Sequence, residues 1–168
     1  MAPTTAPAKK HQKRWREIAS DRLLGELPYK VEANHRGQIV LSPHRFSHSQ
    51  LQRAIQKKLD EVLSGGEVFP ECPITTERGV RPADVAWASA DRVAEMEETG
   101  DPPTLAPEIC IEVMPESNDW EEREEKRALY LKAGAEEVWV ADEEWNVRFF
   151  ADEELEESLV AEGFPSEL

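Results

Sequence analysis

The sequence predicts one α/β domain in which helices flank a mixed β-sheet. The chain has 168 residues, of which 39% are hydrophobic, so it can bury one core and is too short for two comfortable domains. Segments with the apolar pattern of strands alternate with two segments that have helical spacing. No internal repeat interrupts this order. These observations together favour a single mixed domain.

The first sixteen residues, MAPTTAPAKKHQKRWR, differ in composition from the rest. They contain five Lys and Arg residues and no acid. Because the formal net charge of the chain is −15 and this segment contributes +5, the remainder carries −20. A segment rich in Pro, Ala, Thr and Lys buries little apolar surface. We therefore expect a mobile basic arm over residues 1–16 and the folded domain over residues 17–168.

The acidic body restricts the classes of partner. A surface of this charge repels nucleic acid at long range, which weighs against nucleic-acid binding unless positive charge is concentrated locally. The two cysteines, Cys72 and Cys110, form no CxxC pair, and no signal peptide opens the chain, so a cytoplasmic location is predicted. No apolar run approaches the roughly 20 residues of a membrane span. We expect a soluble protein with no membrane partner.

The first half of the body predicts a β-hairpin and a helix. Tyr29–Glu32 and Gln38–Leu41 are extended halves around an Asn-His-Arg-Gly turn. The helix that follows is expected to have Ser47 as its N-cap and to end at Gly65-Gly66. Its apolar residues have helical spacing: Leu51, Ala54, Ile55, Leu59, Val62 and Leu63.

Two further strands are predicted over residues 67–76 and 84–87, joined by a turn that contains glycine. The acidic stretch AEMEETGDPP, residues 94–103, is expected to be a solvated loop. A short buried strand is predicted over Ile109–Met114.

A helix is predicted over residues 119–133. Asn118, followed three residues later by Glu121, is typical of a capped N-terminus, and Gly134 marks the C-terminal end. Two strands, Glu137–Ala141 and Asn146–Phe150, then close the pattern around an Asp-Glu-Glu turn.

A carboxylate lies within the apolar strand predicted over Ile109–Met114, in the stretch APEICIEVMPES. Burying an ionised carboxylate without a partner costs several kcal/mol, so Glu112 is at an open edge, paired, or coordinating a ligand. The helix after this strand is expected to pack back onto the sheet. On that helix Lys126, Leu129, Tyr130 and Ala133 share one face. Lys126 is therefore on the element most able to reach Glu112.

Asp84 is the third member of the predicted site. In DVAW, Val85 and Trp87 point one way while Asp84 and Ala86 point the other, which leaves space beside Asp84. Two carboxylates on adjacent strands can hold one hard divalent cation, Mg²⁺ or Mn²⁺, with Lys126 opposite. This arrangement suits phosphodiester hydrolysis, because the ion polarises the phosphoryl oxygen and the ammonium offsets the charge of the transition state.

The segments RPADVAW, APEICIEVMPES and EEKRALYLKAGAEEVWVAD occur in this order and resemble the Uma-two endonuclease family, a bacterial branch of the PD-(D/E)xK restriction-endonuclease-like superfamily. The resemblance implies a restriction-endonuclease-like mixed sheet and metal-dependent cleavage of DNA. It identifies Asp84 with the PD aspartate, Glu112 with the second acid and Lys126 with a lysine relocated from the strand to the helix. Met114 occupies the usual position of that lysine.

The resemblance extends to the hairpin VEANHRGQIVLSP. It assigns Glu32 as a further metal or water ligand, and His48 matches a histidine at the start of the next helix. Two departures are visible. Ala83 stands between the proline and Asp84, and Asn34-His35-Arg36 replaces an acidic turn.

Alternatives to a DNA nuclease stay open at this point. Glu112 and Lys126 can form a purely structural ion pair. The charge of −20 and Ala83 also fit a catalytically degenerate nuclease fold that serves protein–protein interaction, and a hydrolase of a small nucleotide is a third reading. The basic segment is either a solubility arm or a DNA contact, and a homodimer is compatible with the sequence.

Overall fold

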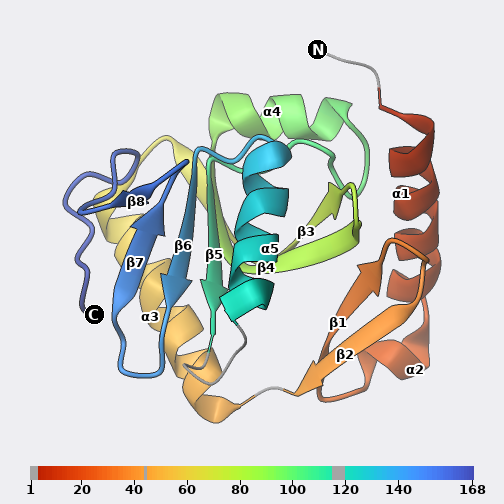
Figure 1. The fold of residues 1–168 in the computed structure, drawn as a ribbon, viewed down its shortest axis with the longest axis horizontal. Coiled ribbons are helices and arrows are strands. Elements are labelled where there is room, and N and C mark those ends of the chain that lie inside the picture. Colours follow the sequence, from red (N-terminus) through yellow and green to blue (C-terminus); the bar gives the residue numbers. More distant parts are fainter. Residues whose placement is uncertain (1–3, 44, 115–119) are drawn as a thin grey trace.

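Helices and strands alternate along the chain in the computed structural model, which describes residues 4–43, 45–114 and 120–168. In chain order the elements are α1 (Ala6–Ala19), α2 (Arg22–Gly25), β1 (Tyr29–Asn34), β2 (Ile39–Pro43), α3 (Phe46–Val62), β3 (Gly66–Thr76), β4 (Gly79–Ser89), α4 (Ala90–Glu98), β5 (Ile109–Val113), α5 (Trp120–Lys132), β6 (Glu137–Ala141), β7 (Val147–Phe150) and β8 (Glu154–Leu155). The predicted mixed α/β fold in a single domain is confirmed (Figure 1).

One eight-stranded mixed sheet organises these elements, in the order β2-β1-β4-β5-β6-β7-β8, with β3 pairing on β4 beside this path. Strands β5 and β6 are parallel, and α5 is the crossover that connects them. The other described strand pairs are antiparallel. The long strand β4 therefore joins the N-terminal hairpin to the C-terminal half of the sheet.

Hydrophobic clusters cover both faces of the sheet, with α5 in front and α3 behind in the view of Figure 1. The α3 face includes Leu51, Ile55, Leu59, Val85 and Ile111. The α5 face includes Ala86, Cys110, Tyr130 and Val138. Because side chains alternate along a strand, Asp84 and Glu112 share the α5 face with Ala86 and Cys110. The fold thus turns both acids toward the helix that carries Lys126.

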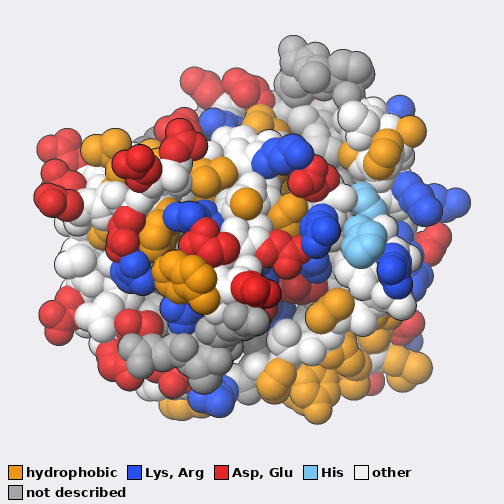
Figure 2. All heavy atoms as spheres, viewed as in Figure 1, with side chains coloured by type: hydrophobic (Ala, Val, Ile, Leu, Met, Phe, Trp, Pro, Cys, Tyr) orange, Lys and Arg blue, Asp and Glu red, His pale blue; other side chains and the backbone are white. Residues whose placement is uncertain are grey.

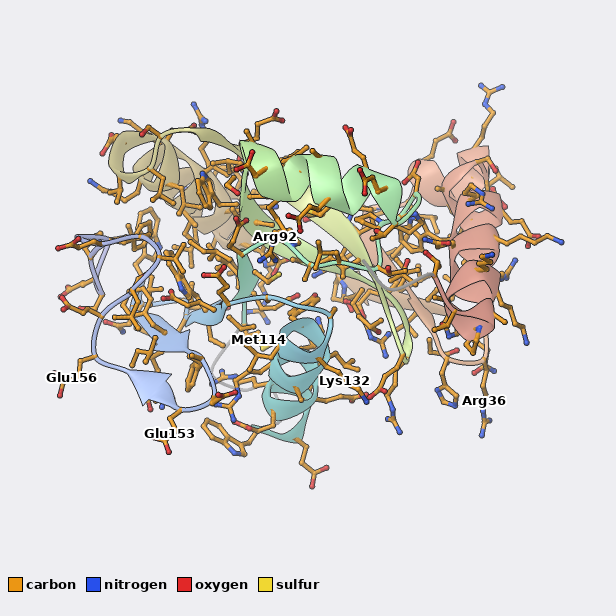
Figure 3. The ribbon with its side chains drawn as sticks, turned by 90° about the horizontal axis from the view of Figure 1, so that it is seen from above. Arg36, Arg92, Met114, Lys132, Glu153 and Glu156 are labelled. Carbon is orange, nitrogen blue, oxygen red and sulfur yellow. The ribbon has the colours of Figure 1, made fainter. Side chains whose placement is uncertain are left out.

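Helix α1 takes the place of the mobile arm expected over residues 1–16. Thr5 caps the helix by accepting a hydrogen bond from the backbone N–H of the third residue after it. The Gln12 amide donates to the carbonyls of Thr99 and Pro102, at 2.9 and 2.8 Å. The Arg14 side chain of α1 donates to the carbonyl of Gly37 at 2.8 Å. Gly37 belongs to the hairpin turn that carries Arg36, and Figure 3 shows Arg36 beside α1. These polar ties, which the composition does not reveal, hold the basic segment against the domain.

The expectation of a loop over residues 94–103 is wrong, because helix α4 extends to Glu98. Ser89 caps it by accepting from the backbone N–H of Arg92, at 3.2 Å. Its Ala, Met and Glu residues are good helix formers, so the acidic composition reflects a solvated helix face. The Arg92 side chain extends from α4 to the carbonyls of Ala106 and Gly134, at 2.8 and 2.9 Å (Figure 3). Only the end of the stretch, after Glu98, is irregular.

The other predicted helices and strands are present, and they differ from the prediction only in where they begin and end. The N-cap of α3 is Arg45, which forms no side-chain cap hydrogen bond, so the helix begins before the predicted Ser47. Strand β6 has the predicted bounds. The predicted N-cap at Asn118 lies outside the described residues. Neither α2 nor β8 was expected, because both are very short.

Strand β2 forms one edge of the sheet and exposes apolar side chains. Figure 2 shows hydrophobic side chains gathered at the lower right, where Figure 1 places β2 and α2. The exposed large apolar residues of this region are Leu23, Leu27, Tyr29, Ile39, Val40, Leu41 and Phe46. None of the described helices is long and apolar enough to span a membrane. The homodimer stays a prediction.

Candidate active site

Asp84 and Glu112 lie on the neighbouring antiparallel strands β4 and β5. The register pairs Val85 with Ile111, so the next position along the ladder sets Asp84 opposite Glu112. The two residues are 1% and 2% exposed. Cross-strand partners project from the same face, and the backbone N–H of Val113 fixes Asp84 by donating to Oδ2 at 2.8 Å. The structure therefore brings together the two acids that the sequence singles out.

Lys126 reaches this pair from α5. Its Nζ lies 3.3 Å from Glu112 Oε2 and 3.0 Å from Glu32 Oε1. One turn further along the helix, the Tyr130 hydroxyl donates to Glu112 Oε1 at 2.6 Å. The helical spacing of Lys126 and Tyr130 thus gives Glu112 two partners from one helix face. Glu32 joins the cluster through Lys126.

Lys30 is a member of the site that the sequence analysis missed. Its Nζ lies 2.8 Å from Asp84 Oδ1, 3.3 Å from Glu112 Oε2 and 3.8 Å from Glu32 Oε1. Lys30 and Glu32 alternate with Tyr29 and Val31 along β1, but this pattern alone does not tell which face of the strand is buried. In this strand the charged residues are buried, whereas Tyr29 is exposed. The polar face of the hairpin therefore points inward, toward the acids.

His48 and Glu71 approach Asp84 from α3 and β3. His48 Nε2 is 3.4 Å from Asp84 Oδ1. The β3–β4 register pairs the neighbours of Glu71 with those of Asp84, which sets these two residues opposite each other. One ligand atom from each of His48, Glu71 and Asp84 lies within 4.8 Å of the others. The Gln52 amide donates to Glu71 Oε1 at 3.1 Å and so holds that carboxylate in place.

Charges balance in the buried part of the cluster. Arg81 contributes a third cation, with Nη1 3.4 Å from Glu32 Oε2. The three carboxylates and the three cations that contact them are Asp84, Glu112 and Glu32, and Lys30, Lys126 and Arg81. Such a set is stable in a low-dielectric interior only while its members stay paired.

The environment separates the proton affinities of the two acids. Burial opposes ionisation of Asp84, but Lys30 and His48 outweigh it, so the pKa of the Asp84 carboxyl lies well below its usual range. Burial raises the pKa of Glu112, and Lys126 and Lys30 offset only part of that effect. Burial also opposes the charge of Lys30, yet the surrounding carboxylates outweigh it and raise the pKa of the ammonium. Asp84 and Lys30 are therefore charged at neutral pH.

A cavity of about 300 Å³ opens above the cluster. Lys30, Asp84, Glu112 and Lys126 are its buried charged residues. Its less buried lining includes Arg45, Ser47, His48, Glu122, Glu143 and Trp145. The volume is at the small end of the range of ligand pockets. The buried charges therefore line a cavity with room for a small group.

A family model matches the part of the chain that contains the whole candidate site. The Uma2 family, described as "Putative restriction endonuclease", matches residues 21–164. The chain belongs to the Uma2 family. The match begins after α1 and includes every strand of the sheet and all the site residues named above. Uma2 membership supports a nuclease role, and it confirms the family that the motifs of the sequence resemble.

A solved structure supports the fold of this Uma2 protein. A "putative nuclease belonging to DUF820" from Anabaena variabilis ATCC 29413 is similar, with a TM-score of 0.60 and 20% sequence identity, over 75% of each chain. At this identity the likeness shows the fold alone. No curated protein matches the chain.

Proposed function

We propose that this Uma2 protein hydrolyses phosphodiester bonds of DNA in a reaction that requires a divalent metal ion. The observation that carries the proposal is the meeting of Asp84, Glu112 and Lys126 at the floor of one cavity. A fixed ammonium beside buried carboxylates stabilises charge that develops on a phosphoryl group. Uma2 membership and the nuclease-like fold support the same reaction class.

Each residue has a distinct task in the proposed reaction. Lys126, held by Glu112 and Glu32, is placed to stabilise the negative charge of the transition state. Tyr130 fixes the orientation of Glu112, and the backbone of Val113 fixes Asp84. A divalent ion bound at Asp84 would polarise the phosphoryl oxygen and lower the pKa of the attacking water.

Both acids already have partners on each oxygen, since Asp84 contacts Lys30 and the backbone N–H of Val113, but among the described residues only Asp84 has further candidate metal ligands beside it, His48 and Glu71. Glu112 already accepts from Tyr130 through one oxygen, and its other oxygen contacts Lys30 and Lys126. The position that contacts both acids is occupied by the Lys30 ammonium. Ligation by both Asp84 and Glu112 stays a prediction from the sequence, as does the additional role of Glu32.

The same position of Lys30 favours a second candidate function. A cluster of three carboxylates and three cations needs no metal ion for charge balance. In this alternative the fold has lost catalysis, Lys30 is a permanent counterion, and the protein serves as an interaction module. The outcome of a cleavage assay separates the two functions.

Wild-type protein is incubated with supercoiled plasmid, single-stranded DNA, RNA and bis(p-nitrophenyl) phosphate, each with Mg²⁺, Mn²⁺ or EDTA. We expect nicking of plasmid in the presence of a divalent ion and none in EDTA. Asp84→Asn should abolish cleavage, whereas Asp91→Asn on the exposed face of α4 should preserve it. Cleavage of the small phosphodiester alone would favour a hydrolase of small nucleotides. Inactivity on all substrates would favour the interaction module.

A further inference from the structure

We propose that His48, Glu71 and Asp84 form a site for a divalent transition metal ion, and that this site binds Mn²⁺ or Zn²⁺ in preference to Mg²⁺. The site differs from the one that the sequence predicts, because Glu112 is not a ligand and two new residues are. It extends the proposed function by naming ligands. It also stands as a binding site whether or not DNA is the substrate.

The spacing of the three ligand atoms is the first argument. They come from α3, β3 and β4, and all lie within 4.8 Å of one another. His48 Nε2 and Asp84 Oδ1 are 3.4 Å apart, and His48 interacts with the Asp84 carboxylate across this distance. Nitrogen and oxygen ligands at about 2.0–2.2 Å from one ion lie roughly 3.0–3.5 Å from each other. His48 and Asp84 therefore have the spacing of two ligands of a common ion.

The charges around the site are the second argument. Glu112 and Glu32 contact Lys30 and Lys126, and Asp84 contacts Lys30. Glu71 has no ion pair with a Lys or Arg within 4 Å among residues 4–43, 45–114 and 120–168, and Gln52 gives it only an amide hydrogen bond. A metal ion beside Glu71 would therefore add positive charge where this carboxylate has no ion pair with a Lys or Arg of the described residues.

The local backbone keeps Glu71 available to the site. Its neighbours Pro70 and Cys72 pair with Val85 and Ala83 of β4, whereas Glu71 itself has a φ of 48°. This left-handed conformation is uncommon for a residue with a side chain. The ladder contacts on both sides hold Glu71 across from Asp84, and Gln52 fixes its carboxylate.

The donor chemistry selects the ion. An imidazole nitrogen with two carboxylate oxygens suits Mn²⁺ and Zn²⁺, whereas Mg²⁺ prefers an all-oxygen shell. Three protein ligands leave positions for water or for an oxygen of a bound substrate. His48 and Asp84 both line the cavity above the cluster, so those positions are accessible from the substrate side.

Binding of Mn²⁺ to the full chain, without DNA, is measured by electron paramagnetic resonance. Pulsed spectra of the bound ion should show coupling to one imidazole nitrogen, and His48→Gln should remove it. Glu71→Gln should weaken Mn²⁺ binding at least about tenfold. Matched controls are His35→Gln and Glu67→Gln, which change an exposed histidine and an exposed glutamate of β3; both should bind Mn²⁺ as the wild type does.

The inference is overturned by any of three results. These are no Mn²⁺ binding at millimolar ion, bound Mn²⁺ without nitrogen coupling, or equal affinity of Glu71→Gln and Glu67→Gln. Glu71 is exposed, so its substitution leaves the core intact and the comparison stands even where His48→Gln is unstable. DNA cleavage without nitrogen-coupled Mn²⁺ would retain the proposed function and reject this site. Nitrogen-coupled Mn²⁺ without cleavage would do the reverse.

Discussion

Replacing Lys30 by methionine should destabilise the protein strongly, because this ammonium contacts three buried carboxylates. The side chain is 8% exposed, and its Nζ lies 2.8 Å from Asp84 Oδ1. Methionine preserves much of the volume of the lysine stem but leaves Asp84 and Glu112 without their shared cation. Removing one partner of a buried ion pair costs about 3–5 kcal/mol. For a domain of this size that corresponds to a loss of roughly 6–20 °C in Tm.

The assay is thermal unfolding followed by circular dichroism at neutral pH, with and without Mn²⁺. Lys58→Met is the matched control, since Lys58 is a partly exposed lysine of α3 that forms an ion pair with the exposed residue Glu61. We expect a change of about 0–2 °C there, because exposed ion pairs contribute little. Mn²⁺ should stabilise Lys30→Met more than the wild type, since a divalent ion can then enter between Asp84 and Glu112.

The double variant Lys30→Met/Asp84→Asn tests the cause of the loss. Neutralising Asp84 should recover part of the lost stability, because one of the stranded charges is removed. Equal melting temperatures for Lys30→Met and Lys58→Met would refute the reasoning. Such a result would mean that the buried acids do not depend on the Lys30 ammonium.

Three further predictions concern other parts of the fold. Burial raises the pKa of the Cys72 thiol to about 12, so Cys72 should resist alkylation at pH 8 until the protein is unfolded, as mass spectrometry can show; rapid modification of the native protein would contradict this. Glu137→Ala should destabilise the C-terminal segment by about 3 kcal/mol or more, because this carboxylate accepts from Trp139 and Ser158 at 2.7 Å. Limited proteolysis should then cleave the variant after β8 at a lower temperature than the wild type. Deleting residues 1–16 should lower both Tm and the salt dependence of DNA binding; an unchanged salt slope would assign α1 to structure alone.

Local sequence was sufficient for the part of the site that α5 and β5 build. Glu112 is conspicuous as a carboxylate in an apolar strand, and Lys126 shares a helix face with Tyr130. A strand followed by a crossover helix brings these residues together by a rule of chain connection. The contact between Lys126 and Glu112 follows from that rule, so the sequence alone could indicate it.

Lys30 and Glu71 required knowledge of strand pairing across long stretches of chain. Lys30 reaches Asp84 only because the hairpin docks on β4, 54 positions further along the sequence. Glu71 faces Asp84 through the register of β3 and β4. A charged residue in a strand is usually on the solvent side, and nothing local reverses that expectation.

The two helices that were expected to be irregular show a different limit. Composition alone predicts a basic tail where α1 lies and an acidic loop over part of α4. In the structure both have a capping residue, Thr5 and Ser89, and α1 is tied to the loop after α4 by Gln12. Capping is visible in the sequence once the helix is suspected, whereas the docking of α1 is a tertiary effect.

Cleavage by Lys126→Met tests the central claim, that the buried cluster is a catalytic site, most directly. Its rate on supercoiled plasmid with Mn²⁺ is compared with that of Lys132→Met, in which an exposed lysine of the same helix is changed, and the melting temperature of each variant is recorded. We predict that Lys132→Met keeps the wild-type rate and that Lys126→Met loses at least about tenfold to a hundredfold while still folded at the assay temperature. Equal rates for the two folded variants would contradict the account, because Lys126 would then be a structural counterion of Glu112.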